Sequence, residues 1–488
     1  MLSSVQILLP SISNTSDVIY YKGYVNFKSD TKVTIYFIKF SENSKTILED
    51  SDKDMKNIIY GCYSEDGIHS STFNKSRNYN KLIISNQSGE LYIKKLFING
   101  NAIDAKDKCL IVFYDLNTIR ESEVEWEYSD ELSKLQQLVL SENRQPESQP
   151  YDATKLSCPI WFSSSMFIQH VINYFNVMKW LLITIKRDKK VSIKHGNLMC
   201  AILMDLILGY VILQYLTQDT KELSSILMGI LENLINILYS LLKWLMGAPA
   251  GLKLNNAFTK MLGKCFSYHV QLWWLFLDVS GEKLDIILHL FYYLGYLGLT
   301  FQAAMISDMI CIGTFHAYCI YVYAARMFNM QISGLIALLR FFVGRKYNPL
   351  RKGIDSCEYT NQELFVGTVA FTIMLLLLPT TLMYYIVFTM FRVLSLLVEY
   401  VLAKFIYQIQ TLPLYVSALW LIRSPKVAGN VLLEVVSQEE ASPFSIQLKL
   451  LNKSLMYLVN NFKPPVDEPK KVVWTSFLSK VFIGEQIL

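Results

Sequence analysis

Two pairs of acidic residues have spacings that occur in sugar-nucleotide chemistry. Asp52 and Asp54 form a D-x-D, a pattern that can hold a divalent metal against a diphosphate. Glu123 and Glu131 have the E-x7-E spacing of a second class of nucleotide-sugar site. The first pair lies in a turn rich in Ser, Lys and Asp, and the second lies among other acids on a surface helix. We interpret both pairs as solvated surface charges, and the sequence contains no GxGxxG, Walker or nucleophile-elbow pattern.

The histidines and cysteines do not form a pattern typical of metal sites. Cys311, His316 and Cys319 are close in sequence, but only the last two share a helical face. We interpret His316 as a hydrogen-bonded residue of helix packing. His269 and His289 have no carboxylate nearby in sequence that would make either a general base. The eight cysteines include no C-x-x-C pair, so neither a zinc site nor a disulfide framework is predicted, and no cofactor is expected.

Three carboxylates lie inside strongly apolar segments, namely Asp205, Glu232 and Glu399. A carboxylate at the depth of a lipid bilayer is costly, so it usually faces other helices or a polar cavity. We therefore expect these residues to mark helix assembly or a functional site.

Basic residues gather in two places beside apolar segments. One group follows a helix end, where a stripe of apolar residues underlies a stripe of lysines across residues 252–266, as in a helix lying in the headgroup plane. Each cation near an anionic leaflet contributes about 1 kcal/mol, so the groups predict a surface for lipid headgroups or for another subunit. Ordinary positive-inside topology explains them equally simply. The candidate site residues are Lys253, Lys260, Lys264, Arg345, Lys346, Arg351 and Lys352.

The composition indicates a membrane protein. The 488 residues are 52% hydrophobic and 18% charged, which is too apolar for a soluble enzyme of this length. The net charge of +5 is modest. The sequence has neither a basic, water-exposed face nor a motif that would predict binding to nucleic acid. We expect a multi-pass α-helical membrane protein with soluble portions.

The hydropathy pattern predicts about six spans. We place two spans at 197–216 and 223–246, two more within 285–325 around a break at Ser307-Asp308, and two at 364–391 and 393–422. Residues 266–277 are expected to be interfacial or re-entrant, and residues 326–352 to form a cytosolic loop. With an even count, both termini are cytosolic.

Four regions follow from this pattern. Residues 1–140 predict a cytosolic α+β domain with strands near 32–40, 57–63, 81–85, 91–98 and 109–114, followed by a helix over 121–140. Residues 141–195 predict a linker and an interfacial helix at 161–185, residues 196–423 the membrane domain, and residues 424–488 a small cytosolic region. The first ten residues lack the basic start of a signal peptide.

Five segments carry a resemblance to a known family. Residues 244–263 (WLMGAPAGLKLNNAFTKMLG) resemble a signature segment of the PIG-Q family, and residues 307–326, 344–356, 367–385 and 412–415 agree with that family in the same order. The likeness is dense over 244–423, with a faint echo at 477–488. Before residue 244 there is none.

The resemblance implies a function without implying a catalytic site. It implies a non-catalytic scaffold subunit of the endoplasmic reticulum complex that transfers GlcNAc from UDP-GlcNAc to phosphatidylinositol, the first step of GPI-anchor biosynthesis. PIG-A would be the catalytic subunit, with PIG-C, PIG-H, PIG-P and PIG-Y as companions. The alternative is a stand-alone lipid-handling enzyme or transporter that uses Asp205, Glu232 and Glu399.

Overall fold

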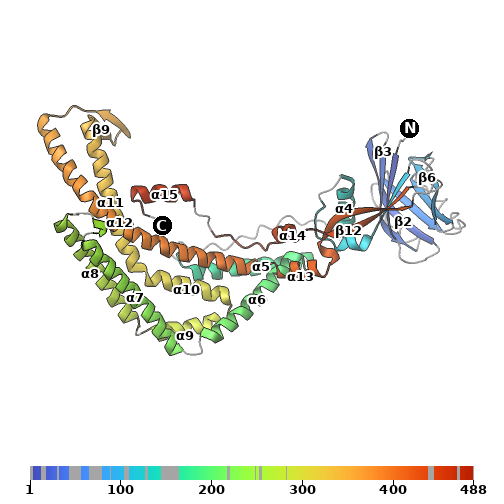
Figure 1. Cartoon of the computed structure of the whole chain (residues 1–488). Coiled ribbons are helices and arrows are strands. Elements are labelled where there is room, and N and C mark those ends of the chain that lie inside the picture. The colour runs from blue at the N-terminus through green and yellow to red at the C-terminus, as the bar shows by residue number, and fades with distance from the viewer. Residues whose placement is uncertain are drawn as a thin grey trace. The chain divides into compact units, whose positions relative to one another are not determined.

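The computed structural model (Figure 1) divides the chain into two compact units. The first comprises Met1–Ala153, Lys190–Asn197 and Pro413–Lys463, and the second comprises Thr154–Lys189, Leu198–Leu412 and Pro464–Leu488. The structure describes residues 4–11, 18–29, 32–42, 57–64, 80–87, 90–103, 109–126, 130–143, 164–216, 220–247, 249–251, 255–281, 283–437, 444–469 and 473–486.

The first unit is built on one mixed β-sheet. Its strand order is β11-β12-β8-β1-β3-β2-β4-β5-β6-β7, with parallel pairs at β12–β8, β8–β1, β1–β3 and β4–β5. Runs of branched and aromatic residues form the strands because such side chains pack well on a pleated surface. The strands are β1 (Ser4–Pro10), β2 (Val18–Ser29), β3 (Lys32–Ser41), β4 (Ile58–Ser64), β5 (Lys81–Gln87), β6 (Glu90–Ile98), β7 (Asn101–Ile103), β8 (Cys109–Tyr114), β11 (Ala428–Ser437) and β12 (Phe444–Asn452). The β-rich N-terminal region predicted from the sequence is confirmed.

The two faces of the sheet are covered differently. Helices α3 (Leu116–Glu121) and α4 (Asp130–Asn143) pack on one face over a core that includes Tyr36, Tyr114 and Leu135. The core on the other face comes from strands β1 to β6 and β8, and no helix in the described part of the chain contributes to it. The shorter elements α13 (Leu414–Leu421), η3 (Pro425–Val427) and α14 (Leu455–Asn461) complete this unit.

The C-terminal strands belong to the same sheet as the N-terminal strands. Strand β12 pairs in parallel with β8, with Phe444 opposite Leu110 and Leu448 opposite Tyr114. One sheet cannot lie on both sides of a bilayer. The number of times that the chain between β8 and β12 would cross a membrane must therefore be even.

The second unit is helical. Its elements are α5 (Met166–Asp188), α6 (Ile193–Leu216), of which residues 193–197 belong to the first unit, α7 (Thr220–Met246), η2 (Pro249–Gly251), α8 (Asn256–Gly281), α9 (Leu284–Gly295), α10 (Leu299–Gly313), α11 (Phe315–Phe342), the hairpin β9 (Arg345–Asn348) and β10 (Gly353–Ser356), α12 (Asn361–Gln410) and α15 (Trp474–Ile483). Among the described residues, four helices are long and apolar enough to cross a membrane: α6, most of α7, α11 and α12.

Several predicted span boundaries are wrong. Ser307 and Asp308 lie inside α10, and the breaks fall instead at residues 296–298 and at Thr314. The predicted loop over 326–352 is helical as far as Phe342. The predicted fifth and sixth spans form one 50-residue helix, α12, which continues through Pro379. Residues 266–277 are part of α8, which is uninterrupted from Asn256 to Gly281.

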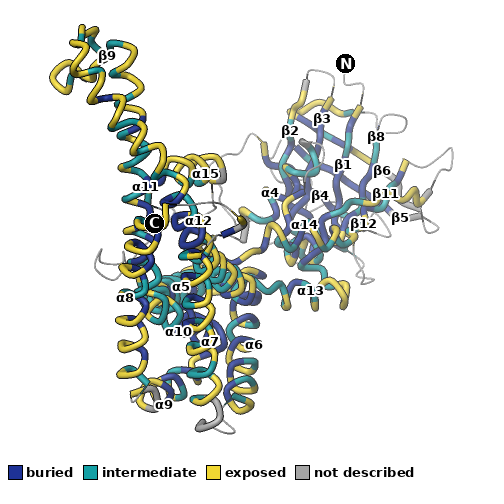
Figure 2. The backbone as a smooth tube through the Cα atoms, turned by 60° about the vertical axis from the view of Figure 1, so that its left-hand side comes forward, coloured by how far each residue is buried: buried dark blue, intermediate teal, exposed yellow. Residues whose placement is uncertain are grey.

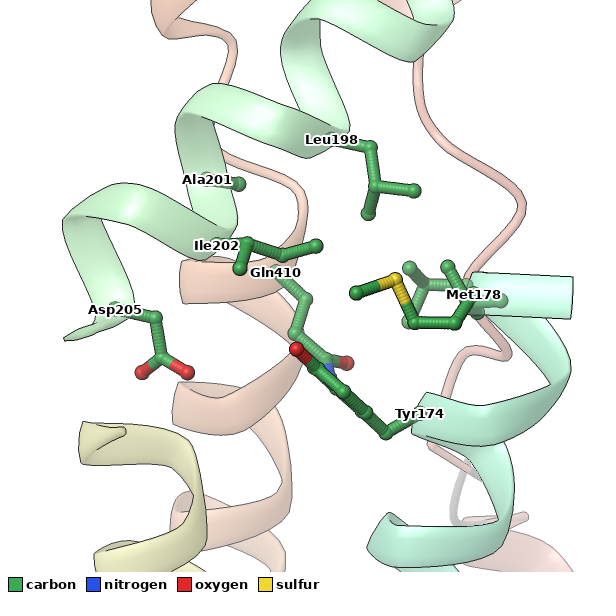
Figure 3. A pocket seen from close by; sticks show the side chains of 9 residues that line it. Tyr174, Met178, Leu198, Ala201, Ile202, Asp205 and Gln410 are labelled. Carbon is green, nitrogen blue, oxygen red and sulfur yellow. The ribbon is translucent and has the colours of Figure 1, made fainter. Parts of the chain in front are cut away.

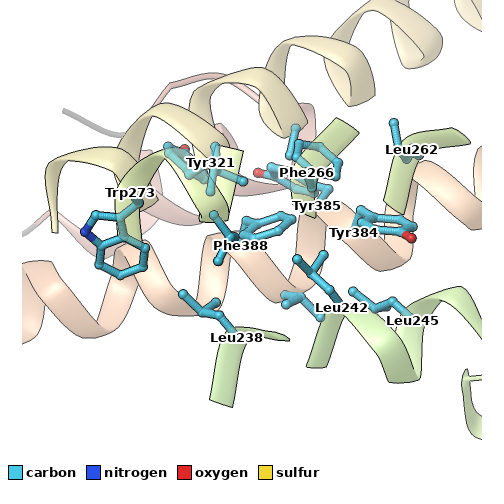
Figure 4. Close-up of a cluster of buried hydrophobic side chains, with 14 of the residues drawn as sticks. Leu238, Leu242, Leu245, Leu262, Phe266, Trp273, Tyr321, Tyr384, Tyr385 and Phe388 are labelled. Atoms are coloured by element: carbon cyan, nitrogen blue, oxygen red, sulfur yellow. The ribbon is translucent and has the colours of Figure 1, made fainter. Parts of the chain in front are cut away.

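The core of the helical unit lies between α7, α8, α11 and α12 (Figure 4). Phe266 of α8 stacks on Tyr384 of α12 with ring centroids 5.5 Å apart, and Phe328 of α11 stacks on Tyr385 at 4.6 Å. Helices α7 and α8 run antiparallel over their whole length, because Gly263 lies against Met246 and Gly281 against Met228. Burial alternates with exposure along these helices (Figure 2), and the exposed face carries many large apolar side chains.

Helix α15 docks onto α11 and α12 through its C-terminal carbonyls. Tyr385 Oη donates to the carbonyl of Val481 at 2.8 Å, and Asn329 Nδ2 donates to that of Ile483 at 2.9 Å. Phe477 and Val481 pack against the core between the helices. The last turn of α15 thus has hydrogen-bond partners that a free helix end lacks.

Candidate functional site

The candidate basic residues lie on two separate elements. Lys260 and Lys264 are exposed on α8, whereas Lys253 lies outside the described residues. The other four, Arg345, Lys346, Arg351 and Lys352, are exposed on the β9–β10 hairpin. Figure 1 shows this hairpin at the free end of α11 and α12. The structure therefore gathers the second group and leaves the first on another helix.

The β9–β10 hairpin is a short antiparallel ribbon that presents cations around an apolar tip. In the strand register, Lys346 lies opposite Asp355 and Tyr347 lies opposite Ile354. The Asp355 carboxylate accepts a hydrogen bond from Asn348 Nδ2 at 2.8 Å. At the turn, Leu350 is 94% exposed.

Asp205 belongs to a buried polar network that joins α5, α6 and α10. Its carboxylate accepts hydrogen bonds from Thr300 N at 2.8 Å and from Thr300 Oγ1 at 2.7 Å. Because that hydroxyl gives its hydrogen to Asp205, His170 Nε2 must be the donor in its 3.1 Å contact with Thr300 Oγ1. Burial lowers the pKa of His170 to about 4, so its ring is neutral at pH 7. Asp205 thus caps the N-terminus of α10.

The chain passes very close to Asp205 at the start of α10. Gly298 has φ +140°, and a Cβ at this position would lie 2.4 Å from Asp205 Oδ2. Gln302 Nε2 donates to the carbonyls of Gly209 at 2.8 Å and Gly295 at 3.0 Å, which fixes the link between α9 and α10 against α6. Only glycine allows this backbone approach.

The cavity beside Asp205 is small (Figure 3). Tyr174 and Met178 of α5, Ile202 of α6 and Gln410 of α12 line it, and its volume is about 20 Å³. A cavity of that volume holds about one water molecule, for which Asp205, Tyr174 and Gln410 supply polar partners. It has no room for a sugar or a lipid headgroup.

The other two carboxylates in apolar segments do not join Asp205. Glu232 lies on the exposed face of α7, so no helix or cavity of the described residues encloses it, and its predicted role in assembly stays a prediction. Glu399 lies on α12 within electrostatic range of Arg392 and of Asp308. Arg392 in turn stacks over the ring of Tyr318 with its guanidinium carbon 4.6 Å from the ring centre. The three carboxylates thus occupy three different places.

Asp308 has a capping role that the sequence did not reveal. Its carboxylate accepts hydrogen bonds from Met166 N at 2.7 Å, Phe167 N at 3.2 Å and Ser165 Oγ at 2.5 Å. These are the first amides of α5, where a negative charge is favoured by the helix dipole. Sequence reasoning also missed His170, Thr300 and Arg392. The only sequence signal that could have indicated these residues was the presence of a polar residue inside an apolar run.

The nucleotide-site candidates are separated. Glu123 follows α3 and accepts hydrogen bonds from Ser192 Oγ at 2.9 Å and Ile193 N at 2.8 Å, so it caps α6. Glu131 lies in α4 and pairs with Lys28 at 2.8 Å. The predicted surface helix that contained both is wrong, because α3 ends at Glu121 and α4 begins at Asp130. Asp52 and Asp54 lie outside the described residues.

The described residues contain no group of histidine, cysteine and carboxylate side chains that would hold a metal ion. His316 lies against Phe276 with ring centroids 5.1 Å apart, and His269 stacks on Tyr323 at 5.3 Å. Both rings thus pack between α8 and α11. His316 Nδ1 is buried and has no hydrogen-bond partner among the described residues, so the helix packing of His316 is as predicted but its hydrogen bond is not seen.

Comparison with known families assigns the helical unit. Residues 168–429 match the family model described as "N-acetylglucosaminyl transferase component (Gpi1)", which is more than half of the chain. The chain belongs to the Gpi1 family. The match runs from α5 to the start of β11 and so includes the Asp205 network, the core between α7, α8, α11 and α12, and the β9–β10 hairpin.

Curated relatives agree with the assignment. "Phosphatidylinositol N-acetylglucosaminyltransferase subunit Q" of Mus musculus is 35% identical over 300 residues, 60% of this chain and 51% of the relative. The Homo sapiens protein of that name is 39% identical over 242 residues, 49% of this chain and 31% of the relative. "N-acetylglucosaminyl-phosphatidylinositol biosynthetic protein gpi1" of Schizosaccharomyces pombe is 28% identical over 278 residues, 57% of this chain and 42% of the relative. The chain thus aligns with about half or less of each relative's length. No solved structure matches it.

Proposed function

We propose that this chain is a non-catalytic scaffold subunit of the membrane complex that transfers GlcNAc from UDP-GlcNAc to phosphatidylinositol, the first step of GPI-anchor biosynthesis. The observation that carries the proposal is the family match over residues 168–429, which covers most of the helical unit. The names of the relatives from mouse and human describe a subunit of such a transferase.

The use of the acidic residues supports a scaffold role. Asp205, Asp308 and Glu123 each cap the N-terminus of a helix contributed by another segment of the chain. A carboxylate held in this way stabilises helix placement and is not available as a general base. The alternative is a stand-alone lipid-handling enzyme or transporter that uses Asp205, Glu232 and Glu399, and these three residues do not form a common site.

The proposed setting is the endoplasmic reticulum membrane, with partners of the PIG-A, PIG-C, PIG-H, PIG-P and PIG-Y types. An arrangement with six crossings needs two membrane-spanning segments in addition to the four described helices of membrane length. Helix α8 supports one, since it runs antiparallel along the whole of α7. The pairing of β12 with β8 supports an even total, with both sheet segments on the cytosolic side.

The exposed basic residues are proposed as surfaces for lipid headgroups or for other subunits. This assignment covers Lys260 and Lys264 on α8, the four cations of the β9–β10 hairpin, and Lys253. Replacing either group with glutamine is expected to lower complex activity or partner recovery, while a single replacement costs little. Unchanged orientation, partner recovery and activity in both variants would mark these residues as ordinary membrane anchors.

Co-purification tests the proposal most simply. The tagged full chain is extracted in mild detergent from cells that make GPI anchors, and the proteins that accompany it are identified by mass spectrometry. We expect the other transferase subunits in stoichiometric amounts, together with GlcNAc transfer to phosphatidylinositol by the purified assembly. Recovery of the chain alone under conditions that preserve transferase activity in the extract would contradict the proposal.

A further inference from the structure

The free end of the α11–α12 hairpin carries an open apolar groove. It is lined by Leu338 and Phe341 of α11 and by Val366, Gly367 and Ala370 of α12, with Gln362 and Glu363 at its end. The groove has a volume of about 470 Å³ and is broadly open. Val366 is 67% exposed, so the groove opens away from the protein.

The absence of a side chain at Gly367 makes room between the two helices. Phe341 lies directly over this residue, because a Cβ there would be 2.6 Å from Phe341 Cε1. Tyr359 packs on the other side of the Phe341 ring with centroids 4.0 Å apart. The wall of the groove is therefore held by an aromatic pair.

Four cations stand next to the groove. Arg345 follows Phe341 by four residues, across the end of α11 at Phe342, and Lys346, Arg351 and Lys352 lie on the same hairpin. None of them forms an ion pair with a carboxylate in the described part of the chain. Of the carboxylates nearby, Asp355 lies opposite Lys346 in the strand register and accepts a hydrogen bond from Asn348 Nδ2, and Glu363 accepts one from Thr360 N at 2.8 Å. These exposed charges can attract an anionic group.

We propose that this end of the α11–α12 hairpin binds one anionic glycerophospholipid of the bilayer, with an acyl chain in the groove and its phosphate on the hairpin cations. The apolar groove lies at the end of α11 and α12 that carries the cationic hairpin, and such a lipid likewise has its acyl chains next to its phosphate. Leu350 at the tip, 94% exposed, is suited to the headgroup layer. The proposal deepens the proposed function and rests on it for the placement of the hairpin at the membrane surface.

Photocrosslinking of the isolated full chain tests the site. The chain is purified in phosphatidylcholine mixed micelles with a phosphatidylinositol that carries a photoreactive acyl chain, and crosslinked peptides are mapped by mass spectrometry. We expect labelling within residues 338–341 and 362–370. Unlabelled phosphatidylinositol or phosphatidylserine should compete, whereas phosphatidylcholine and soluble glycerophosphoinositol should not.

Two variants separate the two halves of the site. Replacing Arg345, Lys346, Arg351 and Lys352 with glutamine should lower labelling at least fivefold, since each cation near an anionic lipid contributes about fivefold to affinity. Ala370→Leu should also lower labelling, because it fills the groove. The matched controls are Thr368→Leu, exposed on α12 and not part of the groove lining, and the set Lys94→Gln, Lys95→Gln, Lys186→Gln and Lys190→Gln, which removes four exposed charges elsewhere. Both controls should label like the unmodified chain.

Three results would overturn the proposal. Equal competition by phosphatidylcholine would show that the site does not recognise an anionic headgroup. Equal competition by glycerophosphoinositol would show that binding does not depend on an acyl chain. Unchanged labelling in Ala370→Leu would show that the acyl chain does not lie in the groove. The test uses neither partners nor transferase activity. Failure of labelling alongside successful co-purification of the complex therefore contradicts the lipid site alone.

Discussion

Acidic residues in this chain hold helix N-termini that belong to other segments. Asp205 caps α10, Asp308 caps α5, and Glu123 caps α6, each through main-chain amides at 2.7 to 2.8 Å. Each carboxylate meets unsatisfied amides and the positive end of the helix dipole, which compensates the cost of its burial. The same charges that made these residues candidates for chemistry thus explain how the helices are positioned.

Replacing Asp205 with alanine should destabilise the fold and leave the chemistry of the complex intact. The change removes two hydrogen bonds to a buried carboxylate and leaves Thr300 N without its partner, which costs about 2–3 kcal/mol. We expect a lower thermal midpoint of the full chain in detergent. Asp205→Asn should cost less because it keeps one acceptor. A loss of activity per assembled complex with an unchanged midpoint would instead restore a direct role in transport or catalysis.

Glu123→Ala should behave as the loss of a helix cap. We expect a destabilisation of about 1 kcal/mol and an unchanged KM for UDP-GlcNAc in the assembled complex. Glu131→Gln serves as the control, since it breaks only an exposed ion pair with Lys28 and should have little effect. A raised KM in both variants would support the nucleotide-site interpretation of their spacing.

Hydrophobic runs in the sequence located the helices but not the breaks between them. The sequence indicated a membrane protein, and the long apolar segments are helices. The Ser307-Asp308 pair suggested a turn because polar residues are costly in lipid, but the α5 N-terminus supplies Asp308 with donors. Pro379 suggested an interruption, yet α12 continues through it. Neighbouring groups in membrane helices take up the freed backbone carbonyls, so proline does not set a boundary there.

The packing of α7 against α8 gives a sharp test. In Gly263→Leu, the new side chain meets Met246, because even a Cβ at this position would lie 2.3 Å from Met246 Cγ. We expect a loss of about 1–3 kcal/mol, seen as a lower midpoint in thermal unfolding. Gly229→Leu on α7 is the matched control, since nothing lies within 4 Å of a Cβ there. Equal midpoints for the two variants would contradict the close α7–α8 contact.

The sheet that joins the N-terminal and C-terminal strands constrains the membrane topology of the whole chain. The sequence predicted the N-terminal strands from their residue types, but it could not show that residues 444–452 join them. That pairing depends on residues more than 300 positions apart, and periodicity within one segment carries no information about it. An even number of crossings follows from the pairing and does not require an exact count of spans.

Glycosylation of the sequons tests this topology. Asn14, Asn74, Asn86 and Asn452 are in N-x-[ST] triplets, which receive glycan only on the lumenal side. Asn14 and Asn74 lie outside the described residues, whereas Asn452 ends β12. With the whole sheet in the cytosol, none of the four should carry glycan. An endoglycosidase-sensitive shift in mobility that is lost in Asn452→Gln would place the sheet in the lumen.

We propose that this Gpi1-family chain organises a transferase without performing the transfer. The direct measurement incubates labelled UDP-GlcNAc and phosphatidylinositol with the purified chain alone, with the remaining subunits alone, and with both together. We expect no transfer by the isolated chain, and transfer by the mixture that falls sharply when the chain is omitted. Turnover by the isolated chain at the rate of the complete complex would contradict it.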